Sequence, residues 1–438
     1  MTPVLVPAAG FDLATARAHA AARLAEFGLP HVRIEEWRFA NPAPITRRAW
    51  PLATDERPDP GVTPIDRFDA GPRHEVRLAA GRFHAVSGPR HGAVLPAGVR
   101  IESLAAAAAR TPEAVLPLLG SIASSDTPAT AFVTQNTALF QDGLFVSVPA
   151  GVALADPVYV GHERGAPAGD SGALVPDRVL VEVGAGASLL LVEDLRHLDP
   201  APDAESGDFV NTVTEIALAP GARCSVVRLV ERHPEFEYHV GSTWVRVAAG
   251  ASFRSLTFAT GGALVRDDVH VRFAGEGGEA TLDGLFVVSG KGLVDHHTML
   301  DHAVPGCTSR ELYKGVIAGS GRGVFNGAVV IRPGAQKSDS AQRNPNLLLS
   351  ADAVIDTKPE LQIYADDVKC AHGATVGQLD DDALFYLRAR GIDAVAARTM
   401  LVHAFAREMV DRLEHAGLRA QVDAWIESRM ERLAREVE

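Results

Sequence analysis

The sequence predicts a mainly β protein, in which a β-helix core lies between helical N-terminal and C-terminal regions. From residue 141 to residue 379, short segments of alternating apolar and polar residues are interrupted by glycines. These interruptions recur at a nearly constant interval, and helical patterns stand before and after them. We therefore expect a mainly helical region over 1–140, a β-helix core over 141–379 and a helical region over 380–438.

The N-terminal region begins with an alanine-rich segment, 11–27, whose leucines and phenylalanines have helical spacing, and Gly28 is expected to end that helix. A run of alternating residues over 74–86 suggests a small strand pair. Helical patterns return over 101–139, where Thr111 fits an N-cap followed by proline at the first helical position. The region is therefore expected to be mixed and mainly helical.

Four segments of the core share one form, an alternating strand, a glycine-containing turn and a second alternating strand. Their turn glycines follow one another at intervals of 35, 29 and 28 residues, and are Gly186, Gly221, Gly250 and Gly278. A repeat of this length indicates a solenoid or a propeller, but a propeller blade needs four strands. Two strands and a tight turn per repeat favour a β-solenoid, with a β-sandwich as the alternative.

The last region reads as three helices. Asp380 is expected to cap the first helix and Gly391 to end it, and Asp393 can cap the second. The second helix carries an apolar stripe and is expected to end at Gly417. These helices could cover the unpaired strands of the last coil, and their apolar stripes fit either a core or a docking face for a partner protein.

Composition and charge narrow the function. The chain has 438 residues and a net charge of -13, which argues against a nucleic-acid-binding surface. Three widely spaced cysteines, Cys224, Cys307 and Cys370, give no disulfide framework and favour a reducing compartment. The first residues do not form a secretory signal, and no apolar run is long enough to span a bilayer. We expect a cytoplasmic protein without a membrane partner.

The candidate metal ligands are Cys370 and His372, in the strand-like motif Cys-Ala-His-Gly. Residues two apart on a strand point to the same face. A thiolate beside an imidazole can bind iron or zinc, but two ligands complete neither a tetrahedral site nor a cluster site. The remaining ligands would have to come from elsewhere. The structural alternative is a buried cysteine beside a histidine with ordinary polar contacts.

Other motifs are weaker. The densest His/Asp cluster runs from Asp295 to His302, but alternation puts His296 and His297 on opposite faces of a strand, which argues against a zinc hydrolase. The glycines at 319–323 suggest a β-turn, and 284–291 lacks the spacing and the Ser or Thr of a phosphate-binding loop. We therefore expect no intrinsic ATP site.

An alternative function is a β-helix carbohydrate-active enzyme, a polysaccharide lyase or hydrolase, that uses paired carboxylates. The candidate carboxylates are Asp267, Asp268 and Asp295, and aromatic residues for binding sugars are absent around them. The absence of a secretion signal also counts against this reading.

From about Gly284 onward the chain closely resembles the SufB/SufD family of iron–sulfur cluster scaffold proteins, and SufD-type members in particular. The resemblance is carried by DHHTMLDHAVPGCTSRELYKGVI, GRGVFNGAVVI, LFYLRARGI and the long segment around Cys370 and His372. It is weaker in the β repeats and slight at the N-terminus. Gly373 stands where SufB-type members carry glutamate, which points to SufD.

The resemblance implies a right-handed parallel β-helix and a non-enzymatic subunit. It implies a SufB-like partner joined through the β-helix ends and a SufC-like ABC ATPase docked on the C-terminal helices. It also implies that Cys370 and His372 are ligands of a transient Fe–S cluster at an interface shared with the partner. Cys224 and Cys307 match no family ligand and are expected to be structural. Whether a homodimer forms without the partner, and whether a flavin binds, stays open.

Overall fold

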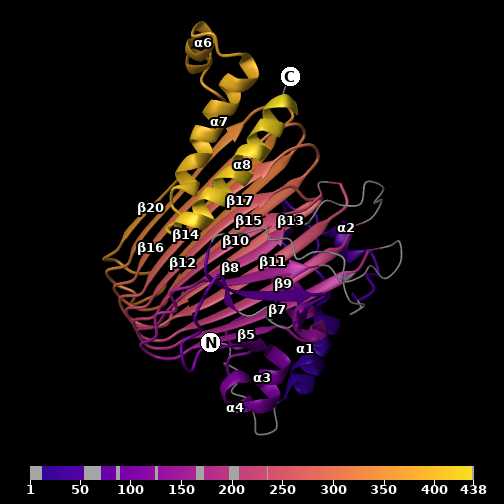
Figure 1. Cartoon of the computed structure of the whole chain (residues 1–438), viewed down its shortest axis with the longest axis vertical. Helices are drawn as coiled ribbons and strands as arrows, with labels where there is room; N and C mark the ends of the chain where they lie inside the picture. Colours follow the sequence, from indigo (N-terminus) through magenta and orange to yellow (C-terminus); the bar gives the residue numbers. More distant parts are fainter. Residues whose placement is uncertain are drawn as a thin grey trace.

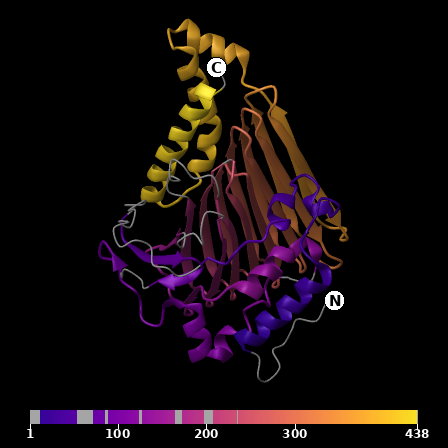
Figure 2. The same ribbon diagram turned by 90° about the vertical axis from the view of Figure 1, so that its right-hand side faces the viewer.

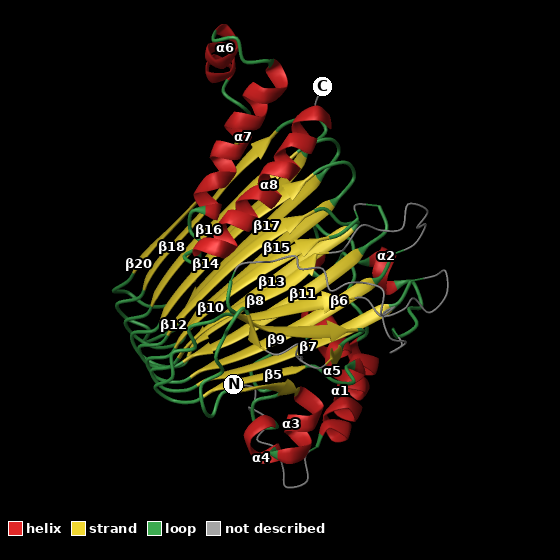
Figure 3. Cartoon of the chain, viewed as in Figure 1, coloured by secondary structure: helices red, strands yellow, loops and turns green. Residues whose placement is uncertain are grey.

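A computed structural model describes residues 12–53, 71–84, 89–123, 127–163, 172–196, 207–233 and 235–436. Its core is a parallel β-solenoid in which successive strands alternate between two facing sheets (Figure 1). Helices lie at both ends of the chain (Figure 3). The mainly β fold with a parallel β-helix core is thereby confirmed. The divisions drawn at residues 140 and 379 stay predictions.

The two sheets are named after the numbering of their strands. The odd sheet has the spatial order β4 (Arg100–Ser103), β5 (Leu144–Val148), β7 (Leu174–Val183), β9 (Phe209–Leu218), β11 (Tyr238–Val247), β13 (Leu264–Phe273), β15 (Leu293–His302), β17 (Arg322–Ile331) and β19 (Val354–Ile363). The even sheet has the order β2 (Arg82–His84), β1 (Arg73–Ala79), β6 (Val158–Glu163), β8 (Ser188–Arg196), β10 (Arg223–Glu231), β12 (Ser252–Thr260), β14 (Glu279–Val288), β16 (Thr308–Ile317), β18 (Asp339–Leu348) and β20 (Lys369–Gly377), with β3 (Pro89–Arg90) beside β1. The strands from β5 to β20 pair in parallel, whereas β2, β3 and β4 pair antiparallel to their neighbours.

The turn glycines explain the repeat. Gly186, Gly221 and Gly250 have φ of 66°, 69° and 61°, a left-handed conformation that glycine adopts without a steric penalty. In the fourth turn the left-handed residue is Gly277, so the prediction of Gly278 was off by one position. Each turn leads from an odd strand into an even strand, and residues one repeat apart lie side by side in the ladders.

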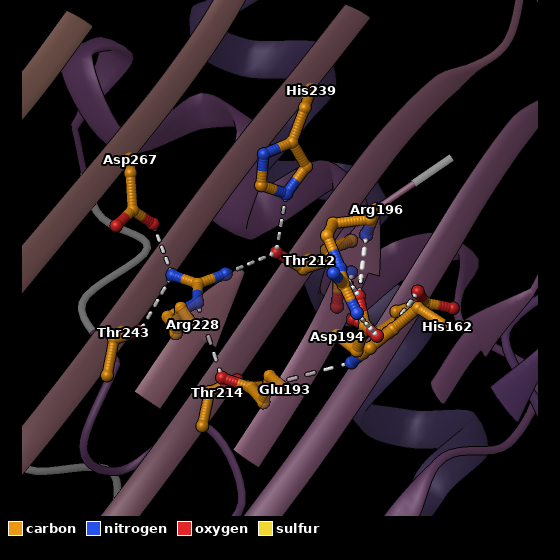
Figure 4. A network of polar contacts seen from close by, with 12 residues as sticks. His162, Glu193, Asp194, Arg196, Thr212, Thr214, Arg228, His239, Thr243 and Asp267 are labelled. Atoms are coloured by element: carbon orange, nitrogen blue, oxygen red, sulfur yellow. Dashed lines mark hydrogen bonds and ion pairs between the residues drawn. The ribbon is translucent and has the colours of Figure 1, made fainter. Parts of the chain in front are cut away.

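The interior of the solenoid holds apolar side chains and, among them, a buried polar network (Figure 4). At its centre the guanidinium of Arg228 donates to Asp267 from the opposite sheet and to Thr243 Oγ1 at 3.1 Å. Its Nε lies 3.3 Å from Oε2 of Glu193. Burial of an ion is costly unless it is paired, and here each charge has a partner of opposite sign.

The N-terminal helices lie in two places. Most of them cover the end of the solenoid opposite β20 (Figure 1), whereas residues 37–45 pack against strands β9, β11 and β13 of the odd sheet. The helices are α1 (Leu13–Phe27), α2 (Ala43–Thr46), α3 (Leu104–Arg110), α4 (Pro112–Val115) and α5 (Ala131–Leu139), with 3-10 turns η1 (Glu35–Trp37) and η2 (Pro128–Thr130). Asn136 of α5 donates from Nδ2 to the backbone oxygens of Asp177 and Asn211, both at 2.9 Å. Gly28 ends α1, as predicted. Thr111 precedes α4 but makes no capping bond, because its hydroxyl donates to Ala107 O at 3.1 Å.

The C-terminal helices are α6 (Asp381–Ala389), α7 (Ala394–Val410) and α8 (Ala416–Glu436). Asp380 and Asp393 cap α6 and α7, as predicted. The predicted end at Gly417 is wrong, since α7 ends earlier and Gly417 lies in the first turn of α8. The helices α7 and α8 lie along the outer face of the even sheet (Figure 2), and their apolar side chains form one cluster with outward-facing residues of β10, β12 and β14.

The helix α6 stands apart from this packing. It projects beyond the sheets (Figure 3), and none of its residues is buried. Within the described part of the chain, no helix is both long enough and apolar enough to cross a membrane.

Candidate functional site

The last turn of the solenoid is open. Among the described residues, β19 has no strand partner other than β17, and β20 has none other than β18, so each strand leaves one edge unpaired. No residue of β19 or β20 is fully buried. Apolar side chains are exposed here, with 50% of Val376 and 61% of Tyr364 accessible. Unpaired strand edges are templates for pairing with another chain.

The structure puts Cys370 and His372 on this open strand, β20. In the parallel ladder Cys370 lies beside Ser340 and His372 beside Gln342 of β18. Since Ser340 and Gln342 face the interior, the two candidate ligands share the face that turns toward the solenoid axis. Cys370 is partly buried against the core, whereas His372 is exposed. The same-face arrangement predicted from their spacing is found.

The thiol of Cys370 is held in its protonated form. Burial raises its pKa above the ordinary value, the backbone N–H of Ser340 opposes this shift, and the charge of Asp339 adds to it. A thiolate is the form that binds metal, so a nearby cation or a bound metal would be needed to stabilise it. Without a metal or a nearby cation, burial therefore favours the thiol of Cys370 over the thiolate that binds metal.

A column of polar side chains leads from the interior to Cys370. The hydroxyl of Ser309 donates to Oγ of Ser340 at 2.9 Å, and Nε2 of His302 lies 2.9 Å from Ser309 Oγ. Ser340 is the ladder neighbour of Cys370. Burial lowers the pKa of His302 to about 4, so its ring is neutral at physiological pH. The column is therefore a chain of neutral hydrogen-bonding groups.

A second polar column leads to His372. Gln342 lies beside it on β18, and the amide Nε2 of Gln342 donates to Glu311 Oε2 of β16 at 2.5 Å. Burial raises the pKa of Glu311 to about 7. Sequence reasoning missed both residues. The signal was the repeat itself, because Gln342 and Glu311 precede His372 by about one and two repeats of roughly 30 residues.

The His/Asp cluster divides between the two faces of β15, as its alternation predicts. His296 faces the interior and is fully buried, and burial lowers its pKa to about 3. His297 faces outward, and its Nε2 lies 2.9 Å from Asp295 Oδ1. In the described part of the chain, no group of three or more His, Cys, Asp and Glu residues could hold a metal ion.

The candidate carboxylates of the carbohydrate-active alternative are also separated. Asp267 faces the interior and is paired with Arg228, whereas Asp268 faces outward and accepts from Arg266 Nε at 3.0 Å. Asp295 likewise accepts from Nη1 of Arg266 at 3.0 Å. A fully buried, ion-paired carboxylate cannot reach a sugar, so Asp267 and Asp268 cannot flank one glycosidic bond.

The glycine motifs adopt the expected structure. Gly319 and Gly321 lie in the turn between β16 and β17, where Gly319 has a φ of 61°, and Gly323 lies at the start of β17. Most of the segment 284–291 is the second half of β14. Neither segment is a loop that opens a helix, which a phosphate-binding loop requires.

Cys224 and Cys307 lie in the core. Cys224 faces the interior from β10, and burial raises its pKa to about 12. Cys307 is fully buried in the turn before β16, and burial raises its pKa as well. Both thiols pack as small apolar groups, which agrees with the structural role expected for them.

Comparison with known proteins agrees with this architecture. Residues 167–405 match the family described as "SUF system FeS cluster assembly, SufBD core domain", and residues 9–160 match the "SufBD protein N-terminal region". The chain belongs to the SufB/SufD family of iron–sulfur cluster assembly proteins.

Within this family the chain is SufD-like. It is 33% identical over 302 residues to the iron-sulfur cluster assembly protein SufD of Escherichia coli, covering 69% of this chain and 70% of that protein. It is 28% identical over 413 residues to a SufBD family protein of Synechocystis, covering 94% and 89%. It is 32% identical over 286 residues to Protein ABCI7, chloroplastic, of Arabidopsis thaliana, covering 64% and 59%.

Proposed function

We propose that this chain is a non-catalytic subunit of a cytoplasmic Suf-type assembly complex. It pairs with a SufB-like scaffold through the open end of its solenoid and docks a SufC-like ABC ATPase on its C-terminal helices. Cys370 and His372 contribute ligands to a transient Fe–S cluster, which is the cargo of the complex, at the interface with the SufB-like subunit.

The observation that carries the proposal is the position of the two candidate ligands on an unpaired edge strand. Cys370 and His372 share one face of β20, and the free edges of β19 and β20 can extend into a partner's sheet. One chain offers two ligands where a cluster needs about four, so a partner that pairs with this edge can bring the others. An incomplete set of ligands from each of the two subunits also suits a cluster that must later be released to another protein.

The docking of an ATPase rests on a different surface. On α6 the side chains of Phe385 and Tyr386 are 74% and 57% exposed, and on α7 Met400 is 51% exposed. The same two helices and the β18–β19 turn line a cavity of about 290 Å³, to which α6 contributes Leu384 and α7 contributes Val402. Exposed apolar side chains on a projecting helix are typical of a protein-binding site. A partner that hydrolyses ATP there could transmit movement to the neighbouring β20.

Co-expression with SufB-like and SufC-like proteins of the same organism tests the proposal. A tagged copy of this chain should retain both partners through gel filtration. Val376→Lys places a charge on the open end and should release the SufB-like partner. Val94→Lys is the matched control, because Val94 is 73% exposed in the N-terminal region.

The proposal fails if neither partner is retained, or if both lysine variants behave like the wild type. The same gel filtration, run on the chain alone, shows whether the open ends pair as a homodimer when the SufB-like partner is missing.

A further inference from the structure

Gln342 is the nearest neighbour of His372 within the even sheet. The two residues are partners in the parallel ladder of β18 and β20, where adjacent strands lie about 4.8 Å apart, and both side chains turn toward the interior. Gln342 is buried, with 1% of its surface exposed, while His372 is exposed at the open end. The amide of Gln342 is therefore the buried ladder neighbour of the exposed imidazole.

Two neighbours, Glu311 and Gly327, determine how the amide of Gln342 is placed. Its Nε2 donates to Glu311 Oε2 at 2.5 Å, which places the NH₂ end of the amide against Glu311. Across the interior Gly327 leaves it room, since a Cβ atom there would lie 1.9 Å from Nε2. The amide oxygen of Gln342 therefore points away from Glu311.

The amide oxygen of Gln342 is a hydrogen-bond acceptor without a donor. Oε1 of Gln342 is inaccessible to solvent and accepts no hydrogen bond from the described residues. A buried acceptor without a partner costs stability, so such an atom calls for an explanation. The ring of His372 likewise makes no hydrogen bond to the described part of the chain. A donor and an acceptor therefore lie on neighbouring positions without being joined.

We propose that Gln342 is a positioning residue for His372, and that its Oε1 accepts a hydrogen bond from one ring N–H of the histidine. A neutral imidazole has one N–H and one unprotonated nitrogen, so holding the N–H leaves the other nitrogen free for iron. Metal-binding histidines usually donate their second nitrogen in this way. The inference rests on the proposed role of His372 as a ligand. Glu311 orients Gln342, and Gln342 orients His372.

The tautomer of His372 is the direct readout, and it does not depend on cluster assembly. Nitrogen NMR of the full chain with labelled histidine distinguishes the two ring nitrogens, and His372→Ala identifies the signals. The wild type should show one tautomer of His372. Gln342→Met keeps the length of the side chain but removes the acceptor, and should give the mixture of a free imidazole. Gln342→Glu combined with Glu311→Gln exchanges the amide and the carboxyl, so it restores an acceptor oxygen without placing two acids together, and should restore the single tautomer.

A mixture of tautomers in the wild type would overturn the inference, whether or not the variants fold. An unchanged single tautomer in a folded Gln342→Met variant would overturn it as well. Cluster maturation in cells separates this result from the proposed function. If His372→Ala leaves maturation intact, the proposed function is wrong, whereas the tautomer result for Gln342 still stands on its own. In the expected case, Gln342→Met lowers maturation about tenfold.

Discussion

Arg412 donates a hydrogen bond from Nη1 to Oδ1 of Asp283 at 2.9 Å and so joins the loop between α7 and α8 to the outer face of β14. Asp283 is buried beneath the C-terminal helices. Burial raises its pKa, and the charge of Arg412 opposes that shift. The contact therefore stabilises the helices on the sheet and keeps a buried carboxylate paired.

Replacing Arg412 should loosen this docking. Arg412→Met leaves Asp283 without its closest cation, and should lower the free energy of unfolding by about 2 kcal/mol. Glu414→Gln is the control, because it breaks only the exposed pair with Arg254 and should cost less than about 1 kcal/mol. Urea denaturation measures both values. Equal effects of the two variants would contradict the structural role of Asp283 and Arg412.

Glu311 should make stability depend on pH. Its pKa is raised from 4.5 to about 7, so its contribution is fully present below pH 4.5 and is lost as the pH rises through about 7. Glu311→Gln keeps an acceptor for Gln342 and removes the titration. Relative to wild type, the variant should gain about 3 kcal/mol between pH 4.5 and pH 8. Urea denaturation at both pH values measures this gain.

The control for Glu311 is Glu113→Gln, an exposed side chain on α4. This exposed substitution should change the free energy of unfolding by less than about 0.5 kcal/mol. If the difference between Glu311→Gln and the wild type were independent of pH, Glu311 would not titrate in this range.

Much of the solenoid could be predicted from the sequence, because the turn glycines and the alternating strands repeat. For each strand, the sequence could not show which of its two faces points into the solenoid. On β10 the outward residues Val227 and Leu229 are as apolar as the inward Val226 and Val230, since α7 and α8 cover the outer face. Arg228, a charged residue in an alternating strand, proves to be fully buried.

The candidate site divides in the same way. The spacing of Cys370 and His372 predicts their shared face, because that depends only on the geometry of one strand. Their pairing with Ser340 and Gln342 in the ladder depends on the register between coils of unequal length, which no local pattern reports. The residues beneath the site were therefore missed.

Alanine substitutions at glycines test how closely the side chains pack inside the solenoid. A Cβ atom at Gly284 would lie 2.3 Å from the ring of Tyr313, which is fully buried. Gly284→Ala should therefore destabilise the chain by about 3 kcal/mol. At Gly373 a Cβ atom would meet nothing within 4 Å, so Gly373→Ala should change stability by less than about 0.5 kcal/mol. Thermal unfolding compares them, and similar melting temperatures would contradict the packing described.

The projecting helix α6 should contribute much of the binding energy for the SufC-like ATPase. Replacing Phe385 and Tyr386 by serine removes exposed apolar surface from α6, and should weaken binding of the SufC-like ATPase about 30-fold without changing the melting temperature. Val94→Ser removes a similarly exposed apolar side chain elsewhere and should leave binding unchanged. Calorimetry with the purified ATPase measures both. Unchanged binding by the α6 variant would place the ATPase on another surface.

The role of His372 is the central claim, and cluster maturation measures it most directly. In cells that depend on this chain, His372→Ala should abolish incorporation of labelled iron into Fe–S enzymes while the complex with both partners still forms. Lys369→Ala, an exposed position on the same strand, should leave incorporation unchanged. Full maturation by a chain that carries both His372→Ala and Cys370→Ser would contradict the account.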